Sequence, residues 1–143
     1  HFDAHPGLKA HRDLLTSIPG IGEQTAAVLL AEMHPVEDYD SVRQLDAHAG
    51  VTPKHHQSGS SVKVRTRMSK IGNARLRKAL YLPAVTATRF NPIVKALYSR
   101  LLERGKAKMT ALGAAMRKLL HLVYGVLKHG KPFNPNYARL EKA

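Results

Sequence analysis

Apolar side chains recur at helical spacing through the first third of the chain and predict three short helices. The first pattern covers residues 8–18 and stops at a Pro-Gly pair, and a wider one starts near Gly22, ends at residue 33 and is followed by His-Pro. The third covers residues 42–49, with Ser41 as the expected N-cap and Gly50 as the expected C-cap.

The same spacing returns in the second half and predicts longer helices. One begins at Asn73, the next has Pro92 in its first turn and closes at Gly105, and the last covers residues 108–129. Between the halves, residues 53–61 have loop composition, and residues 62–68 alternate basic with apolar or neutral side chains, which predicts a strand or extended arm. We therefore expect a mainly all-α fold: a compact helical domain with a basic loop or extended arm at about 53–70.

The length of 143 residues suits one domain with its own core. We assign 1–143 to a single domain, with a helix-hairpin-helix at about 8–34, a serine loop and basic arm at 50–72, and a helical remainder at 73–133. The chain has no cysteine, which excludes disulfides and thiolate zinc sites. It starts at His1 and shows neither a signal peptide nor an apolar run of membrane-span length, so we expect a soluble piece of a longer protein with no membrane partner.

The charge is large and unevenly distributed. The net charge is +13, and the 56 residues between Asp46 and Glu103 hold eleven Lys or Arg and no acid. A solvated helical face normally mixes both signs of charge, so this pattern instead favours contact with a polyanion. Nucleic acid is the partner that the charge predicts.

The string Ile-Pro-Gly-Ile-Gly at residues 18–22 has the form of a helix-hairpin-helix turn. Glycines permit backbone angles that other residues avoid and let a phosphate approach closely, so Gly20, Ile21 and Gly22 are candidate phosphate-binding residues. The alternative is an ordinary turn between two helices, and Glu23 at the helix start would repel a phosphate.

A second candidate site joins the serine loop to a cationic arm. Eight basic residues fall within 25 positions and would make nucleic-acid binding strongly salt-dependent: Lys54, Lys63, Arg65, Arg67, Lys70, Arg75, Arg77 and Lys78. By composition alone, the string Gln-Ser-Gly-Ser-Ser at 57–61 is a flexible polar turn.

Histidines and aromatic residues give weaker indications. The adjacent His55 and His56 are interpreted as surface residues, because neighbours in sequence rarely converge on one metal ion. Three other histidines are interpreted as packing residues: His34, His48 and His121. Four aromatic residues would suit base stacking, but their helical spacing favours the core: Tyr81, Phe90, Tyr98 and Tyr124.

Three segments, in this order, resemble one known family: residues 14–33, 45–84 and 121–133. They are similar to the C-terminal transposase domain of insertion-sequence recombinases related to the Piv DNA invertase, in which a bridge RNA pairs with target and donor DNA. The likeness covers about Leu14 to Phe133. It implies a bacterial or archaeal, cytoplasmic, nucleoid-associated protein that binds DNA and a guide RNA and forms a homo-oligomer at full length.

The resemblance also implies a serine that attacks DNA and becomes joined to a phosphate. The family's serine follows a Gly-apolar-x-Pro element and precedes a glycine, which here is residues 50–53 followed by Ser58 and Gly59. Ser60 and Ser61 remain alternatives. The family's separate N-terminal domain, of the RuvC type, holds Mg2+ with four acidic residues and is absent from this chain. We therefore expect no metal site or cofactor here and no activity of this piece alone.

Three hypotheses follow for the function. The first is a recombinase domain with Ser58 as nucleophile. The second is a helix-hairpin-helix module that binds nucleic acid without catalysis. The third is a scaffold that docks RNA or oligomerises through the helix at 108–129.

Overall fold

The computed structural model describes residues 6–52 and 73–136, and these residues form helices and no strand. The elements in chain order are α1 (Pro6–Thr16), α2 (Glu23–Glu32), the 3-10 helix η2 (Val36–Asp38), α3 (Val42–Ala49), α5 (Ala74–Phe90), α6 (Pro92–Glu103) and α7 (Lys108–His129). The mainly all-α prediction is confirmed. The strand or arm predicted at 62–68 lies outside the described residues.

Most of the predicted helix ends are confirmed. Ser41 is the N-cap of α3, although its side chain makes no capping hydrogen bond, and Gly50 is the C-cap with φ 71°. Asn73 caps α5 through its side-chain oxygen, which accepts a hydrogen bond from the Leu76 N–H at 2.8 Å. At the end of α6 the prediction is off by one residue, because Arg104 is the C-cap and Gly105 follows it with φ 86°.

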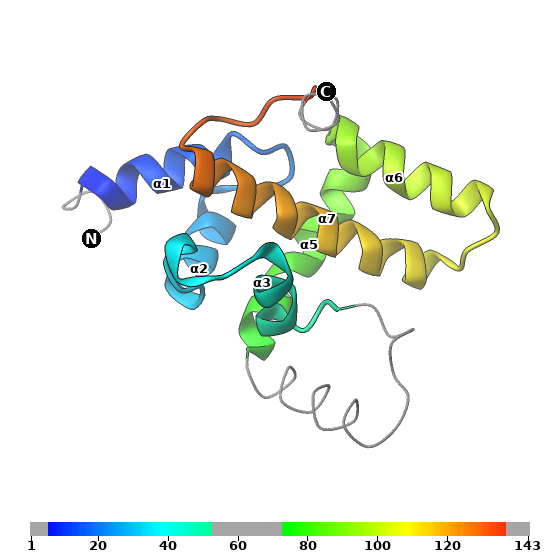
Figure 1. Cartoon of the computed structure of the whole chain (residues 1–143). Helices are drawn as coiled ribbons and strands as arrows, with labels where there is room; N and C mark the ends of the chain where they lie inside the picture. The colour runs from blue at the N-terminus through cyan, green and yellow to red at the C-terminus, as the bar shows by residue number, and fades with distance from the viewer. Residues whose placement is uncertain (1–5, 53–72, 137–143) are drawn as a thin grey trace, which may run out of the picture.

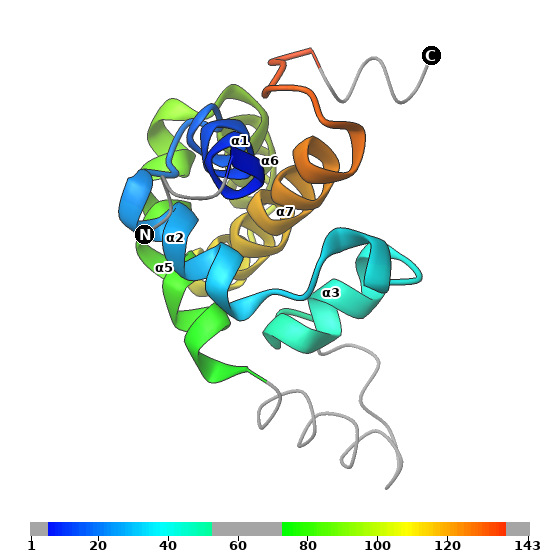
Figure 2. The same cartoon turned by 90° about the vertical axis from the view of Figure 1, so that its left-hand side faces the viewer.

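The helix α7 is the centre of the domain. It is 22 residues long and contacts α1, α3, α5, α6 and η2. Figure 1 shows it crossing in front of α5, and Figure 2 shows α3 on one side of it with α1 and α2 on the other. None of the described helices, α7 included, is long and apolar enough to cross a membrane.

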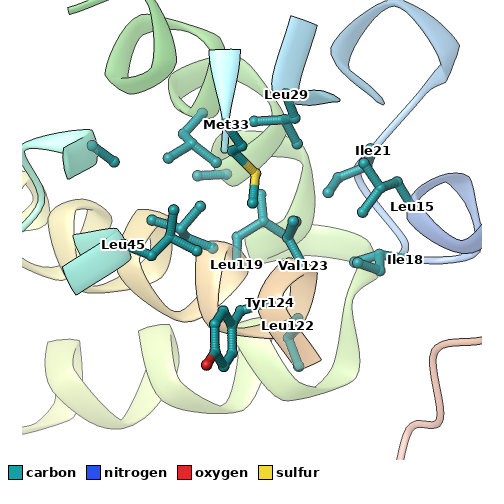
Figure 3. Close-up of a cluster of buried hydrophobic side chains, with 14 of the residues drawn as sticks. Leu15, Ile18, Ile21, Leu29, Met33, Leu45, Leu119, Leu122, Val123 and Tyr124 are labelled. Atoms are coloured by element: carbon teal, nitrogen blue, oxygen red, sulfur yellow. The ribbon is translucent and has the colours of Figure 1, made fainter. Parts of the chain in front are cut away.

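The second half of α7 is buried on nearly every side, which requires helices around its whole circumference. From residue 119 to residue 126, every residue except His121 is buried. Leu119 and Val123 lie among side chains from α1, α2 and α3 (Figure 3). One continuous core therefore joins the first third of the chain to its last helix.

The turn between α1 and α2 packs directly on α5. Gly20 has φ +108°, and a Cβ added there would lie 2.9 Å from the Pro83 carbonyl oxygen and 3.1 Å from the Ala87 Cβ. Ile18 and Ile21 on either side of this contact are buried in the core. A glycine is needed at residue 20 both for the backbone angle and for the close approach of the turn to the helix.

We expect Gly20→Ala to lower the free energy of unfolding by more than about 2 kcal/mol, because it combines a left-handed backbone angle with overpacking. Urea denaturation of the 143-residue chain measures this change. Gly113→Ala is the control: Gly113 is exposed in α7 with nothing within 4 Å of an added Cβ, so this change should stabilise the chain by about 0.5–1 kcal/mol. Equal stability of the two variants would contradict the close approach of Gly20 to α5.

Candidate nucleic-acid interface

The hairpin turn is anchored to the junction of α5 and α6 by a buried asparagine. Asn91 is fully buried, and its side-chain oxygen accepts hydrogen bonds from the N–H groups of Ile93 at 3.0 Å and Val94 at 3.2 Å. Its side-chain nitrogen donates to the Pro19 carbonyl at 3.1 Å. One side chain thus caps α6 and holds the turn 72 residues away in sequence.

This packing divides the predicted phosphate-binding residues into two groups. Gly20 faces α5, and Ile21 is 4% exposed and donates its N–H to the Ile18 carbonyl at 3.0 Å. Gly22, by contrast, is exposed at the N-cap of α2 with extended backbone angles. The Ile21 N–H is therefore engaged inside the turn. The outward-facing start of α2, at Gly22 and Glu23, is the part of this turn region that an anion can reach.

The start of α5 carries the three described members of the predicted basic set, Arg75, Arg77 and Lys78. Asn73 donates from its side chain to the Glu32 carbonyl oxygen at 3.3 Å and to its carboxylate at 3.1 Å, which ties the start of α5 to the end of α2. Arg75 lies 3.8 Å from the Glu32 carboxylate, with its side chain 82% exposed. Lys78 is also exposed and Arg77 is half-buried. At three positions apart, Arg75 and Lys78 share one face of the helix.

The hairpin turn and these basic residues lie at different places along α5. The turn packs at Pro83 and Ala87, eight to twelve residues beyond Arg75. At 1.5 Å per residue, the separation along the helix axis is roughly 12–18 Å. Arg75 and the turn therefore lie at separate places along α5.

The remaining predicted site residues lie outside the described residues. They are the candidate nucleophile Ser58, its alternatives Ser60 and Ser61, and the basic residues Lys54, Lys63, Arg65, Arg67 and Lys70. Their roles stay predictions. The adjacent His55 and His56 fall in the same range.

His121 makes a hydrogen-bonded contact that no sequence pattern indicated. Its Nε2 lies 2.8 Å from both carboxylate oxygens of Asp46, and Asp46 is 5% exposed. Because a carboxylate only accepts hydrogen bonds, the Nε2 atom carries the proton that joins the two side chains. The packing interpretation of His121 was therefore incomplete. No local pattern indicates a pair whose members are 75 residues apart in sequence.

His34 and His48, the other two histidines interpreted as packing residues, form a cluster with Tyr39. The Tyr39 hydroxyl accepts a hydrogen bond from the His34 N–H at 3.0 Å and lies 2.9 Å from the His48 Nδ1. The hydroxyl can donate to the His48 Nδ1 or accept from it, according to the tautomer of the ring. The His34 and His48 rings stack with centroids 5.1 Å apart. Burial, followed by the nearby His34, lowers the pKa of His48, while burial raises the pKa of Tyr39.

The four aromatic residues divide between core and surface. Tyr124 is buried, and Tyr98 packs partly against the core, as their helical spacing predicted. Tyr81 and Phe90 on α5 are instead 42% and 69% exposed, so the core interpretation is wrong for these two. Over residues 6–52 and 73–136, no group of three His, Asp or Glu side chains is placed to hold a metal ion.

Comparison with known proteins identifies the family. Residues 12–99 match the Transposase IS116/IS110/IS902 family. The chain is 36% identical over 131 residues to the pilin gene-inverting protein of Moraxella bovis, which covers 90% of this chain and 40% of that protein. It is 31% identical over 125 residues to an uncharacterized 43.6 kDa protein of insertion element IS110 from Streptomyces coelicolor, covering 86% of this chain and 31% of that protein.

A shorter match reaches the transposase for insertion sequence element IS1111A of Coxiella burnetii, with 38% identity over 74 residues, 50% of this chain and 20% of that protein. The chain belongs to the IS116/IS110/IS902 transposase family. It spans about 40% of the length of the pilin gene-inverting protein that it matches.

We expect the free energy of unfolding to fall as the pH drops below about 6.5, the ordinary pKa of histidine. His48 has a lowered pKa in the folded chain, so the unfolded chain takes up its proton first and is favoured as the pH falls from 6.5 toward the folded-state pKa. Because His48 is partly exposed, the contribution should stay below about 1 kcal/mol. Urea denaturation at pH 7.5 and 5.5 measures it. His48→Gln should lose less stability than the parent chain over this range, and an equal loss would contradict the assignment.

Proposed function

We propose that this chain is the DNA-binding domain of an insertion-sequence recombinase and supplies Ser58 as the nucleophile. The observation that carries the proposal is the position of the acid-free segment after Asp46, which lies largely inside the matched residues 12–99 and contains Ser58. A segment with eleven Lys or Arg and no acid suits a polyanionic substrate.

The described surface supports nucleic-acid binding at two places. Arg75 and Lys78 project from the first turns of α5, immediately after the serine loop and basic arm at 50–72. The exposed start of α2 at Gly22 offers N–H groups, since the first N–H groups of an α-helix have no partner within the helix. Both contacts would go to the phosphate backbone, so they support affinity and positioning rather than sequence recognition.

The chemistry proposed for Ser58 is an exchange of one phosphoester for another. The Ser58 Oγ forms a bond to phosphorus while the bond from that phosphorus to one sugar oxygen breaks; the hydroxyl proton leaves the serine, and the departing sugar oxygen takes up a proton. The number of phosphoester bonds is unchanged, so the strand can be rejoined without a high-energy cofactor. Charge gathers on the phosphate oxygens in this step, and Arg65, Arg67 and Lys70 are the residues proposed to stabilise it.

The domain and partners beyond this chain belong to the same proposal. We propose that an N-terminal domain of the RuvC type, which holds Mg²⁺ in the family that the motifs resemble, activates the serine. The guide RNA and a homo-oligomer at full length are further parts of it. The protein is proposed to act on DNA in the cytoplasm.

A second candidate function is a helix-hairpin-helix module without catalysis. The observation in its favour is the exposed Gly22 at the start of α2, at the end of a turn that is itself fixed by Asn91. Because Gly20 is required for packing on α5, a substitution at Gly20 would change the stability of the fold as well as any binding affinity. Gly22 has nothing within 4 Å of an added Cβ and is the residue with which to test this function.

We expect Gly22→Asp to weaken binding of the 143-residue chain to duplex DNA about 3- to 10-fold relative to Gly22→Asn, because the carboxylate repels a phosphate at the helix start. Asp and Asn are both good N-cap residues, so both variants should be at least as stable as the parent chain. Fluorescence anisotropy with a labelled duplex at low salt measures the affinity, and thermal denaturation checks the fold. Equal affinities would exclude the hairpin from the interface.

We expect Ser58→Ala in the full-length protein to reduce the covalent protein–DNA adduct more than about 100-fold while DNA binding persists, because the nucleophilic oxygen is removed. Trapped adducts are separated on denaturing gels. Ser99→Ala, at an exposed position of α6, is the control and should leave the adduct unchanged. Loss of the adduct in Ser60→Ala or Ser61→Ala alone would move the assignment to that serine. An adduct that persists in all three variants would leave the non-catalytic module as the better function.

A further inference from the structure

A cavity of about 380 Å³ opens where the beginnings of α3 and α6 meet the second half of α7. None of its lining residues was among the predicted site residues. Its α7 wall includes Lys118, His121, Gly125, Lys128 and His129. Its volume falls in the usual range for small-molecule sites and far exceeds what a phosphate group alone would fill.

The hollow follows from the spacing of residues on α7. Positions 118, 121, 125, 128 and 129 are three or four residues apart and therefore share one face of the helix. The residue in the middle of this face is Gly125, which has no side chain to fill the space. Lys118 lies roughly 10 Å before Gly125 along the helix axis, and Lys128 roughly 5 Å after it, at 1.5 Å per residue. Cationic side chains thus lie on both sides of Gly125, a buried residue of the cavity wall.

Two of these side chains are held in position by neighbours. His121 is fixed by Asp46 through the 2.8 Å contacts of its Nε2. The Lys128 Nζ lies 5.4 Å from the centre of the Tyr124 ring and 3.5 Å from its hydroxyl oxygen. Figure 3 shows that hydroxyl directed away from the hydrophobic cluster. Both contacts restrict side chains that would otherwise move freely, which lowers the entropic cost of ligand binding.

The rest of the wall differs from a simple anion site. Val42, Ile93 and Leu122 contribute apolar surface. Asp40 also lines the cavity, and its carboxylate accepts a hydrogen bond from the Gln44 side chain at 3.0 Å. A carboxylate opposes a phosphate, but it accepts hydrogen bonds from the amino groups of bases. The wall therefore combines cations, apolar surface and one acceptor, which are the features of a nucleotide site.

We propose that this cavity binds one unpaired nucleotide of a nucleic-acid strand, with the phosphates on its two sides at Lys118 and Lys128 and its base against the apolar wall. The inference rests on the proposed nucleic-acid-binding function and adds a site that this function does not require. A nucleotide in a duplex has its base stacked and paired and cannot enter, so the site selects a single-stranded or flipped nucleotide.

The test compares two double variants of equal charge in the 143-residue chain. Lys118→Gln/Lys128→Gln removes the two cavity lysines, and Lys106→Gln/Lys108→Gln removes two exposed lysines near the opposite end of α7. Binding of labelled single-stranded pentathymidylate is followed by fluorescence anisotropy between about 20 and 200 mM salt. We expect the cavity variant to bind pentathymidylate about 10-fold more weakly than the parent chain, and the control to bind less than twofold more weakly. The slope of log affinity against log salt concentration should become shallower by about 1.4 in the cavity variant.

Two further measurements separate a nucleotide site from diffuse charge. On a duplex probe, the cavity and control variants should bind alike. Thymidine monophosphate should displace pentathymidylate at roughly a tenfold lower concentration than inorganic phosphate. Equal losses in both double variants on the single strand, or equal competition by phosphate, would overturn the inference.

The outcomes also distinguish this inference from the proposed function. A parent chain that binds neither pentathymidylate nor duplex DNA would overturn both proposals. A parent chain that binds, with a cavity variant that binds equally well, would overturn the nucleotide site alone. Circular dichroism and thermal denaturation confirm that both double variants are folded.

Discussion

The burial of the second half of α7 is the constraint on which the rest of the structure depends. Because residues 119–126 are apolar on nearly every side, the other helices must surround this segment. His121 interrupts that apolar run, and a polar group among buried neighbours needs a partner. Asp46 supplies it from α3, so this hydrogen-bonded pair helps to hold the short α3 against the long helix.

The hairpin turn shows how packing can account for a motif that suggests binding. Gly20 is required by its backbone angle and by the nearby Pro83 carbonyl, while Asn91 holds the Pro19 carbonyl from the other side. These contacts explain the Pro-Gly-Ile sequence without a ligand. What remains for binding is the exposed start of α2 at Gly22, and the rigid turn behind it keeps that helix end in place.

Membership of the IS116/IS110/IS902 transposase family agrees with a basic surface, because a transposase binds DNA. The exposed basic residues at the start of α5, the helix end at Gly22 and the cavity on α7 are built from different elements. They are held relative to one another by a shared core that joins α1, α2, α3 and α7. A nucleic acid that contacted more than one of these places would meet a surface of fixed shape.

The sequence alone predicted the elements well, because helix spacing and caps are local. Ser41, Gly50, Asn73 and Pro92 stand at helix ends, and the predicted bounds follow them closely. The basic segment is equally visible, since charge is counted along the chain. The family resemblance, too, depended only on the order of motifs.

The tertiary structure decided which residues meet across long separations. It brought Asp46 into contact with His121 and the Asn91 side chain to the Pro19 carbonyl. It packed Gly20 against α5, and it left Tyr81 and Phe90 on the surface although their spacing favoured the core. It also formed the cavity beside α7, whose wall combines residues of α3, α6 and α7 with Asp40 and Ser41 before α3. None of these follows from a periodic pattern, because each depends on how helices far apart in sequence pack against one another.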